Sequence, residues 1–221
     1  MIRWVLVALA GVAIVVMLAG VALGISSGDA SDSDEGLVLG GPSRYLGVRQ
    51  LPPYDIPPVA LTATDGSAYD LRASAEGKLL LLYVGYTNCA DACPLHMVEI
   101  ASALEQLPPE LAEQVLVVFV TADPDRDTPE IIETWLANFS TDFVGLTGDQ
   151  AELNNIQRAL GLNPASHTTN DHGGYDVDHG TTVFAFPPES RKAELVYPVG
   201  TTAADYAADI EKLLEDGKVR Q

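Results

Sequence analysis

Two cysteines, Cys89 and Cys93, have the clearest chemical potential in this chain, and both lie in the segment GYTNCADACP. On a helix, residues four positions apart share a face, so both sulfur atoms can point toward one metal ion. The same geometry lies within range of a disulfide. The spacing is therefore compatible with a metal site or a redox pair. A purely structural disulfide across so short a loop would constrain the unfolded chain very little.

Two thiolates do not complete a metal site, and the four histidines are the candidates for a third ligand. His96 follows Cys93 on the same predicted helix, and His167 and His172 lie in a predicted polar loop. We expect these three histidines to be surface residues. His179 differs, because it ends that loop directly before the apolar segment TTVFAF. As a strand, this segment would bring His179 to the end of the sheet where the central loops gather.

Two other features of the sequence are predicted to be structural. The segment DPDRDTPE resembles the start of an EF-hand calcium loop, but Thr128 and Thr134 stand where such a loop requires Gly and Glu. We therefore expect a turn followed by the start of a helix. Met97 could supply a soft ligand, but its helical spacing with Ile100 and Leu104 predicts packing in the core.

Strands and helices are predicted to alternate around the cysteines. Alternating polar and apolar residues around Asp65 and Gly66 predict a hairpin. Apolar runs predict strands at 78–86, 115–122, 143–148, 181–186 and 193–199, with helices starting near 92, 129, 149 and 202 and a loop at 162–178. This order predicts a layered α/β domain with parallel pairing in its centre and the cysteines at a strand-to-helix junction.

The N-terminal region predicts a membrane anchor. Residues 4–25 form an uncharged, apolar run of 22 residues, which is long enough to cross a bilayer as a helix. Arg3 precedes this run and acidic residues follow it, so the positive-inside rule keeps the N-terminus in the cytoplasm. A cleaved signal peptide is the alternative. The predicted organisation is an anchor or signal at 1–28, a linker at 29–50 and a folded domain at 51–221.

The formal net charge of −19, from 31 acidic and 12 basic residues, argues against nucleic acid as a partner. Such a surface repels phosphate backbones. It is compatible with cationic proteins or small cations as partners. With a single-pass anchor, the acidic domain would lie on the extracytoplasmic side of the cell membrane, where disulfides can form and persist.

Four blocks occur in order along the chain: YVGYTNCADACP, VTADPDRDTPE, FVGLTG and YDVDHGTTVFAFPP. Together they resemble the Sco/SenC family of copper-binding proteins, over roughly residues 50–215. The resemblance implies a thioredoxin-like α/β fold, with a central mixed sheet flanked by helices, in addition to the N-terminal transmembrane helix. The family often has Pro and Val where this chain has Ala90 and Ala92, but neither position supplies a ligand.

The resemblance also implies that Cys89, Cys93 and His179 bind copper, with Asp91 at the acidic position between the cysteines. Two thiolates and an imidazole form a soft ligand set that suits Cu(I), and related trigonal sites hold Cu(II). A structural zinc site would require four protein ligands. Only three are evident unless His96 or a carboxylate joins them. A three-ligand site can release its ion to a partner.

The implied function is that of a membrane-anchored copper metallochaperone. It would receive copper from a donor protein and deliver it to the dinuclear copper centre in subunit II of cytochrome c oxidase. The alternative is a thiol-disulfide oxidoreductase with Cys89 and Cys93 as its redox pair. The Cys-x-x-x-Cys spacing, and Thr182 and its neighbours where thioredoxins place a proline, weigh against this alternative. The sequence does not separate a copper or redox sensor from either function.

Overall fold

The computed structural model describes residues 44–170 and 173–219, which lie within a unit that runs from Pro42 to Gln221. The predicted anchor at 1–28 lies outside the described residues. Among the residues that are described, none of the helices has both the length and the apolar character needed to cross a membrane.

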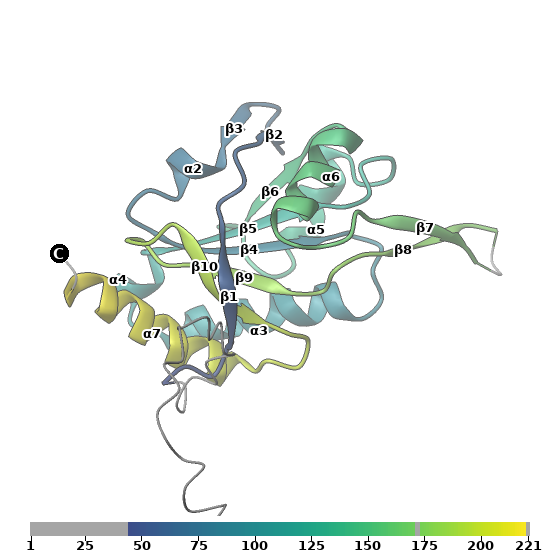
Figure 1. Ribbon diagram of the computed structural model, residues 1–221. Helices are drawn as coiled ribbons and strands as arrows, with labels where there is room; N and C mark the ends of the chain where they lie inside the picture. Colours follow the sequence, from purple (N-terminus) through teal and green to yellow (C-terminus); the bar gives the residue numbers. More distant parts are fainter. Residues whose placement is uncertain (1–43, 171–172, 220–221) are drawn as a thin grey trace, which may run out of the picture. The chain divides into compact units, whose positions relative to one another are not determined.

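An eight-stranded mixed sheet forms the framework of the domain (Figure 1). In its centre, β4 (Leu79–Gly85) pairs in parallel with β5 (Val115–Thr121), and β5 pairs in parallel with β6 (Val144–Thr147). On its other side, β4 pairs antiparallel with β9 (Val183–Phe186). All residues of β4 and β9 are buried, which explains why both strands read as continuous apolar runs. The outer strands are β1 (Val48–Asp55), β10 (Lys192–Tyr197), β2 (Ala60–Ala63) and β3 (Ala68–Asp70).

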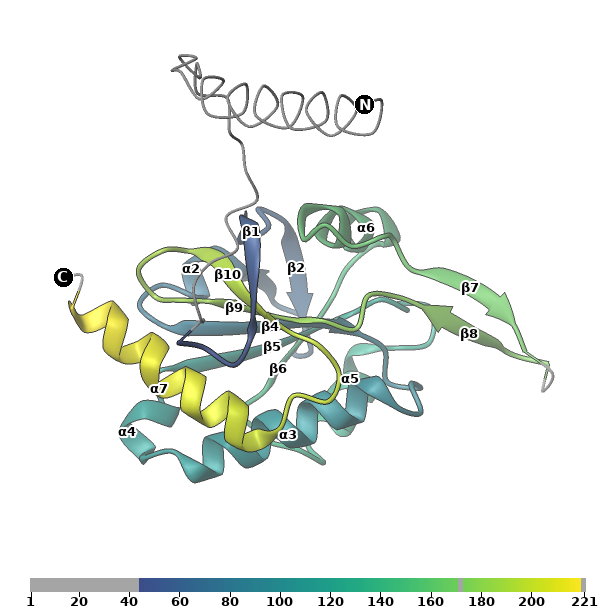
Figure 2. The ribbon, with the colours of Figure 1, turned by 60° about the horizontal axis from the view of Figure 1, so that its bottom comes forward.

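Helices cover both faces of this sheet. α3 (Ala92–Gln106) and α7 (Ala203–Val219) pack side by side on one face, whereas α6 (Gln150–Ala159) lies on the opposite side from α7 (Figure 1, Figure 2). Three shorter helices complete the set: α2 (Leu71–Ser74), α4 (Pro109–Ala112) and α5 (Pro129–Leu136). The predicted mixed α/β architecture is therefore confirmed, although α2 and α4 were not among the predicted elements.

The predicted helix starts agree with the observed caps. The Thr128 side chain accepts a hydrogen bond from the Ile131 amide at the start of α5. Asp149 and Glu152 form a capping box at the start of α6. In α3, Met97 is fully buried, which confirms that its helical spacing marks a core position.

The segment at 162–178 is not the predicted loop. It contains a hairpin of β7 (Ser166–Thr169) and β8 (Tyr175–Asp178), which extends away from the rest of the domain in both views (Figure 1, Figure 2). Every residue of β7 is exposed. A strand without a buried face lacks the alternation of polar and apolar residues by which strands are predicted, so the prediction of a loop was wrong.

The described structure includes strand residues before residue 51, the predicted start of the folded domain. β1 starts at Val48 and pairs with β10 at the edge of the sheet. Just before it, the backbone amides of Leu46 and Gly47 each donate a hydrogen bond of 2.8 Å to the buried carboxylate of Asp209 on α7. The prolines of β1 concealed this strand, because proline lacks the amide that a central strand requires and is tolerated only at an edge.

Candidate metal centre

The two cysteines lie at the carboxyl end of β4, where the chain turns into α3. Cys93 is in the first turn of α3, but Cys89 lies in the turn before the helix, where its amide donates to the Tyr86 carbonyl. The two cysteines were expected to share one face of a helix, but only Cys93 is helical. The turn that contains Cys89 brings its sulfur near that of Cys93 instead. In this turn the Cys93 amide donates a hydrogen bond of 3.4 Å to Cys89 Sγ, which holds the two sulfurs near each other.

Strand pairing brings the third predicted residue to the cysteines. His179 lies between β8 and β9, and β9 pairs with β4, with Val183 opposite Tyr83. As a result, His179 Nε2 lies 3.6 Å from Cys93 Sγ, and one ligand atom from each of Cys89, Cys93 and His179 lies within 4.8 Å of the other two. The structure thus gathers the three residues that the sequence singled out.

The His179 ring is oriented as a metal ligand would be. Its Nδ1 lies 2.9 Å from the Gly180 carbonyl oxygen. A carbonyl can only accept, so Nδ1 carries the proton and the lone pair of Nε2 faces the sulfurs. A hydrogen bond from Nδ1 to a carbonyl oxygen fixes the tautomer of many metal-binding histidines. The Tyr86 ring also meets the His179 imidazole edge to face, at 5.4 Å between ring centroids.

The two thiols have different environments. Cys89 is partly exposed, whereas Cys93 is completely buried. Hydrogen bonds from the Cys93 thiol and from the Cys93 amide hold the pKa of Cys89 well below its usual range. Burial, together with the neighbouring Cys89 sulfur, raises the pKa of Cys93. Without metal, the pair therefore holds one proton, with the negative charge on the sulfur that solvent reaches.

A buried carboxylate supports the turn that carries Cys89. Asp127 is 1% exposed and accepts hydrogen bonds from the Thr87 amide at 3.0 Å, the Thr87 hydroxyl at 2.6 Å and the Thr121 hydroxyl at 2.7 Å. Burial raises the pKa of Asp127. The predicted turn and helix start at this segment are confirmed. The role of Asp127 in positioning the cysteine turn was not predicted, because it depends on contacts with Thr87, which lies 40 residues away.

A second buried carboxylate, Asp123, supports the hairpin that leads to His179. It pairs with the Arg126 guanidinium and accepts a hydrogen bond of 2.8 Å from the Tyr175 hydroxyl. Arg126 donates to the Tyr175 carbonyl and lies 3.8 Å from the centre of its ring. His167, an exposed residue as expected, stacks on Tyr175. The base of the hairpin is thereby tied to the loop after β5. His172 lies outside the described residues.

His96 is not the surface residue that was predicted. It is 2% exposed, because it belongs to the face of α3 that packs against α7. Its Nε2 donates to the Thr181 carbonyl at 2.9 Å, and its Nδ1 accepts from the Tyr206 hydroxyl at 3.1 Å. Both ring nitrogens therefore have protein partners. His96 connects the cysteine helix to the segment after His179 and is not a fourth ligand here.

The comparisons with known proteins identify the family. Residues 55–215, more than half of the chain, match the family model described as SCO1/SenC. The chain belongs to the SCO1/SenC family. The predicted resemblance is thereby confirmed, and the cysteine turn and His179 both fall within the matched region of this SCO1/SenC chain.

Solved structures of SCO1/SenC relatives have the same fold. Copper-bound ScoI from Bradyrhizobium japonicum is 29% identical with a TM-score of 0.63, over 71% of this chain and 97% of that one. Apo Sco1 from Thermus thermophilus is 28% identical with a TM-score of 0.64, over 82% of this chain and all of that one. These likenesses confirm the predicted thioredoxin-like fold.

Among curated sequences, a protein of Stutzerimonas stutzeri named as copper-binding is 37% identical over 125 residues. The match covers 56% of this chain and 61% of that relative, so the chain spans less than two thirds of the relative's length. Copper, the metal predicted from the sequence, is thus confirmed as the metal named for relatives in this family.

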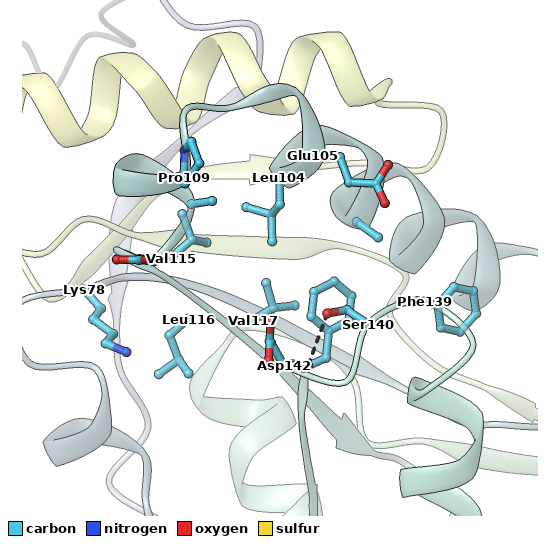
Figure 3. Close-up of a pocket in the computed structure, with 14 residues that line it drawn as sticks. Lys78, Leu104, Glu105, Pro109, Val115, Leu116, Val117, Phe139, Ser140 and Asp142 are labelled. Atoms are coloured by element: carbon cyan, nitrogen blue, oxygen red, sulfur yellow. Dashed lines mark hydrogen bonds between the residues drawn. The ribbon is translucent and has the colours of Figure 1, made fainter.

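A hollow of about 510 Å³ lies at the other end of the parallel strands (Figure 3). Lys78 and Val115, at the start of β4 and β5, line it together with residues of α3, α4 and the segment after α5. Cys89 follows the opposite end of β4. Among the described residues that line this hollow there is no cysteine or histidine, so it is separate from the thiol and imidazole group.

The asymmetry of the thiols predicts selective alkylation. In the reduced, metal-free protein, iodoacetamide should modify Cys89 and leave the buried Cys93 unmodified. Because Cys89 is already a thiolate at neutral pH, its rate should change less than about twofold between pH 8 and pH 6. An ordinary thiol with a pKa near 8.5 would slow by roughly 80-fold over this range.

Mass spectrometry of the modified peptides measures both rates. The Cys89→Ser variant is the matched control, since its remaining thiol should react only after unfolding in urea. A steep fall in the Cys89 rate on acidification, or equal reactivity of the two thiols, would contradict the described asymmetry.

Proposed function

We propose that this chain binds copper through Cys89, Cys93 and His179 and serves the assembly of cytochrome c oxidase as a copper metallochaperone. The observation that carries the proposal is the convergence of two sulfurs and one imidazole nitrogen within 4.8 Å. This donor set suits copper, because thiolates are soft ligands and imidazole binds copper in either oxidation state. The copper named for relatives of the family agrees with this choice.

In this proposal copper is cargo, and transfer proceeds by exchange of ligands. The partly exposed Cys89 is the ligand that a partner's thiol can approach, whereas the buried Cys93 would be the last to release the ion. Each ligand from the partner replaces one ligand from this chain, so the copper ion passes from one protein to the other without being fully hydrated. A site with three protein ligands favours such exchange more than a closed four-ligand site does.

The finer features of the proposal come from the sequence. The target would be the dinuclear copper centre of subunit II, and a separate donor protein would supply the copper. Residues 4–25 would span the membrane once, within an anchor at 1–28, with the N-terminus in the cytoplasm. The linker from residue 29 would lead to the copper-binding domain on the extracytoplasmic side.

A thiol-disulfide oxidoreductase is the second candidate, and the asymmetry of the thiols favours it. A partly exposed thiolate beside a buried thiol is the arrangement of a nucleophile with its resolving partner. Cys89 would attack a disulfide of the target, and Cys93 would then displace the reduced target, leaving a Cys89–Cys93 disulfide. Cytochrome c oxidase subunit II or another exported protein would be the substrate.

Copper stoichiometry distinguishes the two functions. The full-length chain in detergent, with reduced cysteines, should retain one copper and show a thiolate-to-Cu(II) charge-transfer band. His179→Ala should lose or shift this band, because the imidazole ligand is gone. His167→Ala removes an exposed histidine outside the three-residue group and is the matched control. A parent chain that retains no copper, but whose cysteines cycle readily between dithiol and disulfide, would support the oxidoreductase instead.

A further inference from the structure

The side chain of Tyr83 reaches the cysteine pair from inside the domain. Tyr83 lies on β4, is 1% exposed, and its hydroxyl donates a hydrogen bond of 3.4 Å to Cys93 Sγ. Its ring packs against His96 at 5.0 Å between centroids and meets His179 edge to face at 6.3 Å. Gly85 makes this approach possible, because a Cβ at this position would lie 2.7 Å from the Tyr83 ring and 3.0 Å from Cys93 Sγ.

The buried hydroxyl of Tyr83 has an unusual acceptor, the sulfur of Cys93. A neutral thiol is a weak acceptor, and a buried tyrosine hydroxyl normally donates to a stronger one. Within the described part of the chain, the Tyr83 hydroxyl donates to no oxygen atom. A sulfur that carries negative charge, as a thiolate or a metal-bound thiolate, is a much better acceptor, because hydrogen bonds to ionised groups are roughly twice as strong.

We propose that the Tyr83 hydroxyl is a positioning group of the site that stabilises negative charge on the Cys93 sulfur. Such a donor withdraws electron density from the sulfur. It therefore favours the reduced state of the group to which the sulfur is bonded, which is either the second cysteine or a copper ion. In the reduced, metal-free pair, the Cys93 thiol shares the negative charge of Cys89 through their hydrogen bond, so a donor to Cys93 favours the dithiol over the disulfide. For copper, and here the inference rests on the proposed function, it favours Cu(I) over Cu(II).

Tyr83→Phe removes the hydroxyl and keeps the ring that packs against His96 and His179. Tyr197→Phe is the matched control, since Tyr197 is also fully buried and its hydroxyl donates to Asp209 at 3.4 Å, not to a cysteine. Both variants lose one buried hydroxyl of the same kind. Thermal unfolding of the full-length proteins shows whether the two changes affect stability to a similar extent.

The first measurement uses metal-free protein equilibrated with reduced and oxidised dithiothreitol. In this reaction the Cys89–Cys93 disulfide accepts two electrons and the one proton that the reduced pair holds, while dithiothreitol closes its own disulfide and releases its second proton to solvent. The equilibrium constant for reduction should fall by about threefold to tenfold in Tyr83→Phe, because the dithiol has lost its donor. It should be unchanged in Tyr197→Phe.

The second measurement uses the copper-loaded protein. The ratio of Cu(I) affinity to Cu(II) affinity should fall by about tenfold in Tyr83→Phe, which corresponds to 59 mV for a one-electron couple. The charge-transfer band should also shift to lower energy, because the sulfur becomes the stronger electron donor. Tyr197→Phe should match the parent in both properties.

The two measurements separate the inference from the proposed function. The inference is supported if the dithiothreitol equilibrium shifts in Tyr83→Phe and not in Tyr197→Phe. This holds even if the parent retains no copper and the chaperone function is wrong. If Tyr83→Phe and Tyr197→Phe give the same dithiothreitol equilibrium, the inference is overturned, even if the parent binds one copper. In that case the hydrogen bond only satisfies a buried hydroxyl.

Discussion

Replacing Cys93 by serine is expected to reduce the affinity for Cu(I) by at least about 10³-fold, or roughly 4 kcal/mol. The substitution exchanges a soft thiolate for a hydroxyl that does not ionise near neutral pH. One thiolate and one imidazole then remain. The effect should exceed that of His179→Ala, because Cys93 is the buried member of the pair and water cannot easily replace its sulfur. Competition with a Cu(I) chelator of known affinity measures the loss.

The serine variant should fold, since its hydroxyl fits the space of the thiol and can accept the hydrogen bond from Tyr83. Val98→Ser is the matched control, because it introduces a serine on the exposed side of the same helix. Its copper affinity should equal that of the parent. If Cys93→Ser retained an affinity within about tenfold of the parent, copper would have to be held by residues outside the proposed group.

Replacing Asp127 by alanine is expected to lower the free energy of unfolding by about 2–4 kcal/mol. The change leaves the Thr87 amide and the hydroxyls of Thr87 and Thr121 without their acceptor. It should also loosen the turn before Cys89 and speed the loss of copper, although Asp127 touches neither sulfur. Urea unfolding at pH 7 measures the stability, and transfer of copper to a chelator measures the release.

Asp127→Asn is the control that separates shape from charge. The asparagine oxygen can accept from the Thr87 amide and the Thr121 hydroxyl, while its NH₂ group donates to the Thr87 hydroxyl. The free energy of unfolding of this variant should fall by less than about 1 kcal/mol.

Burial raises the folded-state pKa of Asp127, so the stability that Asp127 contributes is largest at low pH. That contribution falls as pH rises from the unfolded pKa through the folded one.

The asparagine variant should therefore lack this part of the pH dependence of stability. Equal unfolding free energies for the alanine and asparagine variants would show that the hydrogen bonds of Asp127 do not hold the cysteine turn.

Local patterns in the sequence predicted most of the fold. The apolar runs of β4 and β5, the cap at Thr128 and the core spacing of Met97 all appear in the structure where they were expected. Each of these features depends on residues within a few positions of one another, so periodicity and capping preferences reveal it. The hairpin of β7 and β8 escaped prediction, because every residue of β7 is exposed and β8 has only Val177 buried.

The sequence by itself determined which residues could do chemistry: Cys89 and Cys93 by their spacing, and His179 by its place before a buried strand. Only the tertiary structure decided how they differ and what supports them. The burial of His96 and the contact of Tyr83 with Cys93 depend on the packing of β4 against α3 and of α3 against α7. The support of the cysteine turn by Asp127 depends on the pairing of β4 with β5. The contact between Cys93 and His179 joins positions 86 residues apart. No local pattern specifies such contacts, because strand pairing and helix packing create them only when the chain folds.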